Sequence, residues 1–214
     1  VTTFLGMRGL EHEYKVMGLA PYGEPKYVDK ILDNLINLKD DGSFSLDMKY
    51  FDYCAGLKMT SKHFYNLFDG PRRTPETELQ QKHMDLARSI QEVTEIAMIR
   101  MAKHVQKETA EKNLVIAGGV ALNCVGNGKI LREKIFENVW IQPAAGDAGG
   151  ALGAALFVWH QVLENGRRVD NKRDLQKGSY LGPSFEISEI QDYLNSISAS
   201  YKKLNESELV EKTA

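Results

Sequence analysis

The sequence Asn113-Leu-Val-Ile-Ala-Gly-Gly-Val-Ala-Leu-Asn123 contains a short apolar run that ends in a pair of glycines. This pattern is typical of a buried parallel strand that passes directly into the N-terminus of a helix, a junction that binds phosphates and nucleotides. Because glycine has no Cβ, a ligand can approach the main chain closely there. The sequence therefore predicts that the N–H groups of Gly118, Gly119 and Val120 face outward and are available to a ligand.

A second stretch, Gln142-Pro-Ala-Ala-Gly-Asp-Ala-Gly-Gly-Ala-Leu-Gly153, repeats this pattern and adds a carboxylate, Asp147. A single acid among glycines and alanines is explained by a cationic or hydroxylic ligand, or by a metal. It is also explained by helix capping, because aspartate is a favoured N-cap and stabilises a helix by about 1 kcal/mol. The glycines of this stretch would destabilise a helix that contains them. We therefore expect either close packing of that helix on a sheet or close approach of a ligand to compensate for this cost.

The apolar spacing around these stretches predicts strands over 113–118 and 138–143 and helices over about 123–135 and 147–164. Such alternation favours parallel pairing with right-handed crossovers, which makes this part of the chain α/β. A long helix over about 75–111 precedes it, with Thr74 as N-cap and Pro75 at the first helical position. We expect its apolar stripe in the core and polar residues such as Glu95 on its other faces.

The N-terminal part is expected to be less regular. Prolines and glycines interrupt the first 25 residues, so Glu13 and Lys15 are expected on an extended segment, where they would share a face. Apolar spacing predicts an amphipathic helix over 27–38, then a turn at 40–43 and a strand or hairpin arm over 44–53. Residues 54–75 carry no clear pattern, and a short helix is predicted over 185–194.

Composition restricts the class of protein. The chain has 214 residues, 43% of them hydrophobic, and a formal net charge of −2. Its Lys and Arg residues are scattered, which argues against a nucleic-acid partner. Its two cysteines and five histidines show no metal-ligand or disulfide spacing, so a reducing cytoplasm fits. No apolar run approaches the roughly 20 residues that cross a bilayer, and the N-terminal stretch lacks the order of a signal peptide, so no membrane partner is expected.

Four motifs occur in one order along the chain: Glu13-Tyr-Lys-Val-Met-Gly-Leu-Ala-Pro-Tyr-Gly23, Gly118-Gly-Val-Ala-Leu-Asn123, Pro143-Ala-Ala-Gly-Asp147-Ala-Gly-Gly-Ala-Leu-Gly153 and Tyr180-Leu-Gly-Pro183. With this combination the chain resembles the NodU/CmcH-type O-carbamoyltransferases over almost its whole length, more weakly after about residue 185. The resemblance implies an actin/sugar-kinase-like α/β fold, related to the tRNA threonylcarbamoyl transferases. A mixed, partly parallel sheet with flanking helices is expected.

The resemblance also implies a domain organisation. The family joins this domain to a YrdC-like domain that makes carbamoyladenylate from ATP and carbamoyl phosphate. The family's paired-histidine metal motif and its arginine-rich YrdC-like segment have no counterpart in this sequence. Residues 1–178 are therefore expected to be the C-terminal half of the actin-like domain, and 179–214 a connector and the start of the YrdC-like region. Such a fragment is expected to be inactive alone, because the N-terminal half and the YrdC-like domain are missing.

Roles for single residues follow from the same resemblance. Asp147 matches the family's metal-ligand aspartate, in a site for iron(II) or another divalent metal that two histidines outside this chain complete. The adenylate, from ATP or as carbamoyladenylate, is implied to bind at Gly118, Gly119, Val120, Asn123 and Gly146. Glu13 and Lys15 match the family's Glu-Tyr-Lys position and are the catalytic candidates, with a structural ion pair as the alternative. The carbamoyl group would pass to a hydroxylated small-molecule acceptor.

Two other functions fit parts of this pattern. A tRNA threonylcarbamoyl transferase shares the glycine loop and the aspartate, although the segment 13–23 and the near-neutral charge speak against it. A non-catalytic nucleotide-binding domain that has kept the scaffold is the other.

Overall fold

The computed structural model describes residues 1–9, 11–167 and 176–213, which form two compact units, Val1–Gly166 and Arg167–Ala214. The second unit holds a short 3-10 turn, Lys177–Ser179, and two helices, α7 (Ile187–Ser196) and α8 (Glu206–Thr213). Helix α7 confirms the helix predicted over 185–194, shifted by two residues. The predicted domain boundary after residue 178 falls within the 3-10 turn, and the identity of the two domains stays a prediction.

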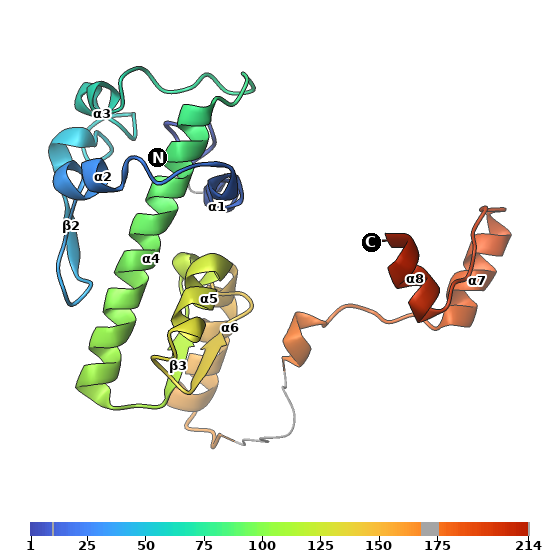
Figure 1. Cartoon of the computed structure of the whole chain (residues 1–214). Coiled ribbons are helices and arrows are strands. Elements are labelled where there is room, and N and C mark those ends of the chain that lie inside the picture. The colour runs from blue at the N-terminus through green and yellow to red at the C-terminus, as the bar shows by residue number, and fades with distance from the viewer. Residues whose placement is uncertain (10, 168–175, 214) are drawn as a thin grey trace. The chain divides into compact units, whose positions relative to one another are not determined.

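Helix α4 (Gln81–Thr109) is the longest element of the first unit (Figure 1). The segments around its N-terminal half are α1 (Glu13–Leu19), the 3-10 turn η1 (Ala20–Tyr22), α2 (Val28–Asn34) and α3 (Lys62–Leu67). Strands β1 (Ile36–Leu38) and β2 (Phe44–Leu46) form an antiparallel hairpin, and the 3-10 turn η2 (Met48–Tyr50) follows. After α4 come β3 (Asn113–Ile116), η3 (Gly119–Leu122), α5 (Cys124–Arg132), β4 (Asn138–Ile141), α6 (Ala148–Phe157) and a π-helical turn, Val158–Val162.

The chain is α/β, with two separate two-stranded sheets in its described part. Strands β3 and β4 pair in parallel, with Val115 beside Trp140, so the predicted parallel pairing is confirmed. The expected single mixed sheet is wrong for these residues, because the antiparallel hairpin β1–β2 does not join the parallel pair. The predicted elements over 113–164 are all present, each ending within a few residues of its expected bounds except the last helix, which becomes π-helical after Phe157.

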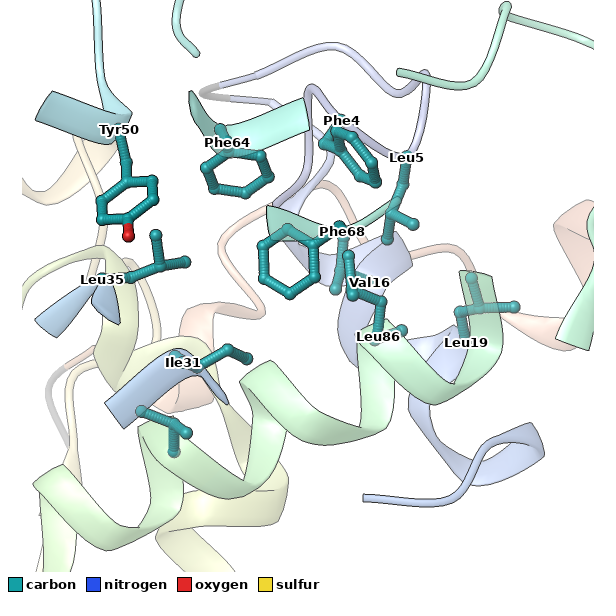
Figure 2. Close-up of a cluster of buried hydrophobic side chains, with 12 residues drawn as sticks. Phe4, Leu5, Val16, Leu19, Ile31, Leu35, Tyr50, Phe64, Phe68 and Leu86 are labelled. Carbon is teal, nitrogen blue, oxygen red and sulfur yellow. The ribbon is translucent and has the colours of Figure 1, made fainter. Parts of the chain in front are cut away.

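Two hydrophobic clusters lie along α4. The first surrounds its N-terminal half and contains three aromatic residues in mutual contact, Phe4, Phe64 and Phe68, whose tilted rings have centroids 4.9–5.8 Å apart (Figure 2). The second joins the C-terminal half of α4 to α5 and to one face of the parallel sheet, through Met98, Ile99, Ile130 and Phe136. Helix α4 therefore connects the N-terminal motif to the glycine loops.

Helix α4 starts six residues later than the sequence predicts. Thr74 and Pro75 belong to a turn in which the Thr77 hydroxyl donates to the Thr74 carbonyl, and Glu76 has a φ of 63°, which a helix excludes. The helix begins instead after Gln80, whose side chain accepts from the backbone of His83, while the His83 ring accepts from the Gln80 N–H. This reciprocal capping replaces the predicted threonine cap.

The helix predicted over 27–38 is also wrong in its second half. It ends at Asn34, and Ile36–Leu38 is a strand because it pairs with Phe44–Leu46 across the predicted turn. Gly42 has a φ of 85°, and a Cβ there would lie 2.4 Å from the Met101 backbone nitrogen, so the turn requires glycine. The arm predicted over 44–53 is a strand only as far as Leu46.

Within the described residues, the structure contains no helix that is both long enough and apolar enough to cross a membrane.

Candidate functional site

The carboxyl ends of β3 and β4 bring the two glycine-rich stretches together. Both strands point the same way, so the loops that follow them leave the same edge of the sheet. The Gly118 N–H donates to the Ala145 carbonyl across this edge, at 2.8 Å. Gly146 follows Ala145 directly, and a Cβ on Gly146 would be 3.9 Å from the Leu122 side chain. The two loops are therefore neighbours, as the sequence leads one to expect.

One of the three N–H groups predicted to face a ligand does not do so. The Gly118 N–H donates to the Ala145 carbonyl. Gly118 has a φ of 99°, a backbone conformation that favours glycine at this position. The N–H groups of Gly119 and Val120 lie in the first turn of η3, where no described residue accepts a hydrogen bond from them. A Cβ at Gly119 would have no neighbour within 4 Å. The space in front of these two donors is open.

Asn123 has a structural role in addition to any ligand contact. Its Oδ1 accepts from the Gly126 N–H at 2.9 Å and caps α5. Its amide also pairs in both directions with Gln91 on α4, at 3.0 Å in each direction. Most of its hydrogen-bonding capacity is therefore already used by the fold.

Asp147 precedes α6 but does not cap it through its side chain. The carboxylate is exposed, and it makes no ion pair with a described residue. Capping through a side-chain hydrogen bond, one of the two explanations of this acid, is therefore not observed. Its oxygens are free to contact a ligand.

Helix α6 has no buried side chain. A Cβ on Gly149 would lie 2.1 Å from the Ala144 carbonyl oxygen, so this glycine allows the loop to approach the helix. A Cβ on Gly150 or Gly153 would meet no atom of the loop or sheet within 4 Å. Close packing on the sheet, one of the two expected compensations, is therefore not observed at these glycines, because the Gly149 contact is with the loop that follows β4.

Asp147 by itself does not make a metal site. Over the parts of the chain that the structure describes, no three His, Cys, Asp or Glu side chains are grouped so as to hold an ion. The exposed carboxylate is suited to supply one hard oxygen ligand. Any metal bound there would need further ligands from other residues.

Glu13 and Lys15 lie in helix α1, so the expected extended segment is wrong. Residues two apart on a helix point in different directions, so the two side chains do not share a face. Glu13 is one turn from Met17, whose Sδ lies 3.9 Å from the Sγ of Cys124, next to Asn123. Helix α1 therefore lies beside the start of α5, with Glu13 on the side of Met17.

A buried carboxylate holds the N-terminal motif against α4. Asp85 accepts from the Glu24 N–H at 2.9 Å, from Lys26 Nζ at 2.7 Å and from Gln81 Nε2 at 2.8 Å. A Cβ on Gly23 would lie 2.0 Å from the Met84 carbonyl oxygen, so this glycine allows the motif to touch the helix backbone.

Sequence periodicity missed the polar residues on the buried side of α4. Glu95, expected on an exposed face, is 5% exposed, as is Gln91. Lys129 on α5 donates to Glu95 at 3.2 Å. The spacing of Gln91 and Glu95 by four residues is a signal that the two share one face, but the sequence gives no sign of their partners.

A separate recess of about 690 Å³ lies at the amino ends of β3 and β4. Lys112 and Glu137, which form an ion pair at 2.9 Å, line part of it. None of the predicted site residues does, so this recess is distinct from the glycine loops.

Comparisons with known proteins agree with the sequence resemblance. A family model described as carbamoyltransferase N-terminus matches residues 1–156. A Synechocystis protein, sll1178, is 56% identical over the whole chain, which spans 35% of that protein. The nodulation protein NolNO of Sinorhizobium fredii is 38% identical over 75% of the chain, and NolO of Bradyrhizobium diazoefficiens is 36% identical over 81%. The chain spans about a third or less of the length of these relatives.

Proposed function

Because the chain belongs to the carbamoyltransferase family, we propose that its two glycine loops form part of the carbamoyladenylate site of an O-carbamoyltransferase. In the proposed reaction a hydroxyl oxygen of the acceptor forms a bond to the carbamoyl carbon. The bond from that carbon to the phosphate oxygen breaks, AMP leaves and the hydroxyl proton passes to a base.

One observation carries the proposal: the hydrogen bond from Gly118 to Ala145 joins the two loops at the carboxyl edge of the parallel strands. Two unpaired N–H groups, at Gly119 and Val120, and the free carboxylate of Asp147 then belong to one region of the chain. Main-chain N–H groups at a strand-to-helix junction bind phosphate oxygens. Gly146 keeps the second loop free of a side chain at this edge.

Helix α1 is proposed to approach the same ligand from the side. Glu13 lies on the side of α1 that bears Met17, and Met17 touches Cys124 at the start of α5. Its carboxylate is suited to contact the acceptor or the ribose. Lys15 lies on a different side of α1, so we propose that the two residues act separately rather than as a pair.

Asp147 is proposed to supply one ligand to iron(II) or another divalent metal, with the remaining ligands from residues outside this chain. Such an ion, when bound, polarises the carbamoyl carbonyl as a Lewis acid. The described residues support this in one respect, which is the exposed carboxylate that makes no cap or ion pair.

The full-length relatives suggest a larger enzyme. We propose that residues 1–178 are the C-terminal half of an actin-like domain, and that 179–214 lead into a YrdC-like domain that makes carbamoyladenylate from ATP and carbamoyl phosphate. The use of ATP suits a cytoplasmic enzyme. This chain alone is expected to transfer nothing.

The test is a transfer assay with the full-length protein. Labelled carbamoyl phosphate, ATP and a panel of hydroxylated sugars are expected to give a labelled carbamate ester together with inorganic phosphate, pyrophosphate and AMP. Formation of threonylcarbamoyl-tRNA instead, when threonine and tRNA are added to the same assay, would support the related threonylcarbamoyl activity. Neither product, from a folded protein that binds ATP, would favour a nucleotide-binding scaffold and contradict the proposal.

A further inference from the structure

A buried polar network on α4 lies directly behind the Gly118–Asn123 loop. Gln91 and Glu95 are each 5% exposed, one helical turn apart, on the side of α4 that faces α5. Buried polar groups are costly unless their hydrogen bonds are satisfied, so the pattern of bonds in such a network is informative.

The Gln91 amide is fully occupied. Its Nε2 donates one hydrogen to Glu95 Oε1 at 3.1 Å and the other to Asn123 Oδ1 at 3.0 Å. Its Oε1 accepts from Asn123 Nδ2 at 3.0 Å. Reversing the amide would place its oxygen against both Glu95 and Asn123 Oδ1.

Glu95 fixes the direction of these bonds. Its carboxylate faces two cations, with Lys129 Nζ at 3.2 Å from Oε2 and an Arg88 nitrogen at 3.7 Å from Oε1. An ionised carboxylate only accepts hydrogen bonds. Gln91 therefore has to present its NH₂ group to Glu95, and Asn123 has to present its oxygen to Gln91 Nε2.

This order leaves one hydrogen on Asn123. Its Oδ1 is held by Gln91 and by the Gly126 N–H, and its Nδ2 gives one hydrogen to Gln91. The second Nδ2 hydrogen has no acceptor among the residues that the structure describes. The Asn123 side chain can therefore donate a hydrogen bond to a ligand, whereas its oxygen already accepts two hydrogen bonds within the protein.

We propose that Gln91 and Glu95 are positioning residues that hold Asn123 as a hydrogen-bond donor to an oxygen of the adenylate. The inference rests on the proposed function, because it assigns the ligand of the same loop. The oxygen concerned belongs to the phosphate or the ribose, since both present lone pairs.

Two pairs of variants of the full-length protein test this, with AMP as the titrated probe. Gln91→Leu removes the amide at similar size. Asn34→Leu is its control, because Asn34 is another hydrogen-bonded amide, half-buried where Gln91 is buried, with Lys30 and Tyr50 as partners away from the loop. Glu95→Gln replaces the carboxylate, which can only accept hydrogen bonds, with an amide that can also donate them. Its control is Glu92→Gln, which removes another carboxylate bonded to Arg88 but without contact to Gln91.

We expect Gln91→Leu and Glu95→Gln to raise the Kd for AMP about five- to tenfold, the range for one lost hydrogen bond. The two controls are expected to change it less than twofold, although Asn34→Leu also lowers the melting temperature. Should Gln91→Leu fail to fold, Glu95→Gln decides, because it preserves the shape of the side chain.

Equal AMP affinity in Glu95→Gln and Glu92→Gln, in a parent that binds AMP, would overturn the positioning role and leave the proposed function intact. A folded parent that does not bind AMP would contradict the proposed function itself, and the positioning role with it.

Discussion

At the level of single residues, Asn123 and Asp147 occupy similar positions, each directly before a helix at the same edge of the parallel strands. Their side chains nevertheless differ in what they bind. Asn123 caps α5 through the Gly126 N–H, whereas Asp147 makes no such bond to α6. A favoured capping residue that does not cap is available for other contacts.

The first prediction concerns Asp147→Asn in the full-length protein. Because the carboxylate makes no cap or ion pair, we expect the free energy of unfolding to change by less than about 0.5 kcal/mol. The neutral amide is a poor ligand for a hard metal ion, so bound metal and transfer activity should fall together. Elemental analysis measures the bound metal, and urea unfolding measures the free energy of unfolding. Stoichiometric metal and normal turnover in the variant would remove Asp147 from the site.

At the level of elements, α4 joins the N-terminal motif to the Gly118–Asn123 loop by polar contacts. Near its N-terminus Asp85 binds the Glu24 N–H and the Lys26 ammonium group, and further along Gln91 binds Asn123. Burial favours the neutral form of Asp85. The hydrogen bonds from Lys26, Gln81 and the Glu24 N–H outweigh burial and keep the pKa of this carboxyl below its ordinary value of 3.8.

The second prediction follows from the direction of that pKa shift. A carboxyl whose pKa is lowered by folding stabilises the protein above its unfolded pKa, and this contribution disappears as pH falls through the lower folded pKa. We expect Asp85→Asn to cost about 1–3 kcal/mol at pH 7, since it disturbs three bonds to a buried group. Below pH 3.8 parent and variant should converge. Urea unfolding across this range measures the difference, and a constant gap would contradict the assignment.

Local periodicity was enough to predict β3, α5, β4 and the parallel pairing, because their apolar residues repeat at regular spacing and glycines mark their ends. The sequence analysis predicted no helix at α3, although the local sequence contains the signals for one. Ser61 caps that helix, and the buried Phe64 and Phe68 follow at a spacing of four. Other errors have non-local causes. Strand β1 exists because it pairs with β2, and the start of α4 is delayed where Arg73 bonds to the carbonyls of Phe4 and Leu5.

The candidate site was predictable to a similar extent. Chain order and glycine content located the two loops, but the bond from Gly118 to Ala145 and the pairing of Asn123 with Gln91 join residues far apart in sequence. No local pattern specifies such partners. Local patterns also failed to predict the helix that contains Glu13 and Lys15. This helix packs against α4 and forms in spite of the glycines around it.

At the level of the whole molecule, one face of the parallel sheet packs on α4 and α5 and the other is open. On the open face Val115 is 66% and Trp140 49% exposed, side by side. Parallel sheets are normally covered on both faces. The relatives are about three times as long as this chain, and we expect further residues of the full-length protein to cover this face.

The third prediction tests that expectation with Val115→Lys in the full-length protein. If the face is covered, a buried charge should cost more than about 2 kcal/mol of unfolding free energy, a value typical of a disrupted core. Leu57→Lys is the control, because Leu57 is fully exposed at 106% and should change stability by less than about 0.5 kcal/mol. Equally small effects would mean that the face stays exposed to solvent.

The central claim is that the glycine loops hold the adenylate, and calorimetric titration of AMP into full-length Gly119→Val tests it most directly. A Cβ at Gly119 has no neighbour within 4 Å, so the variant should fold with an unchanged melting temperature. The branched side chain would occupy the open space in front of the Gly119 and Val120 N–H groups, and we expect the Kd for AMP to rise at least about tenfold. Equal affinity in parent and variant, with both folded, would contradict the claim.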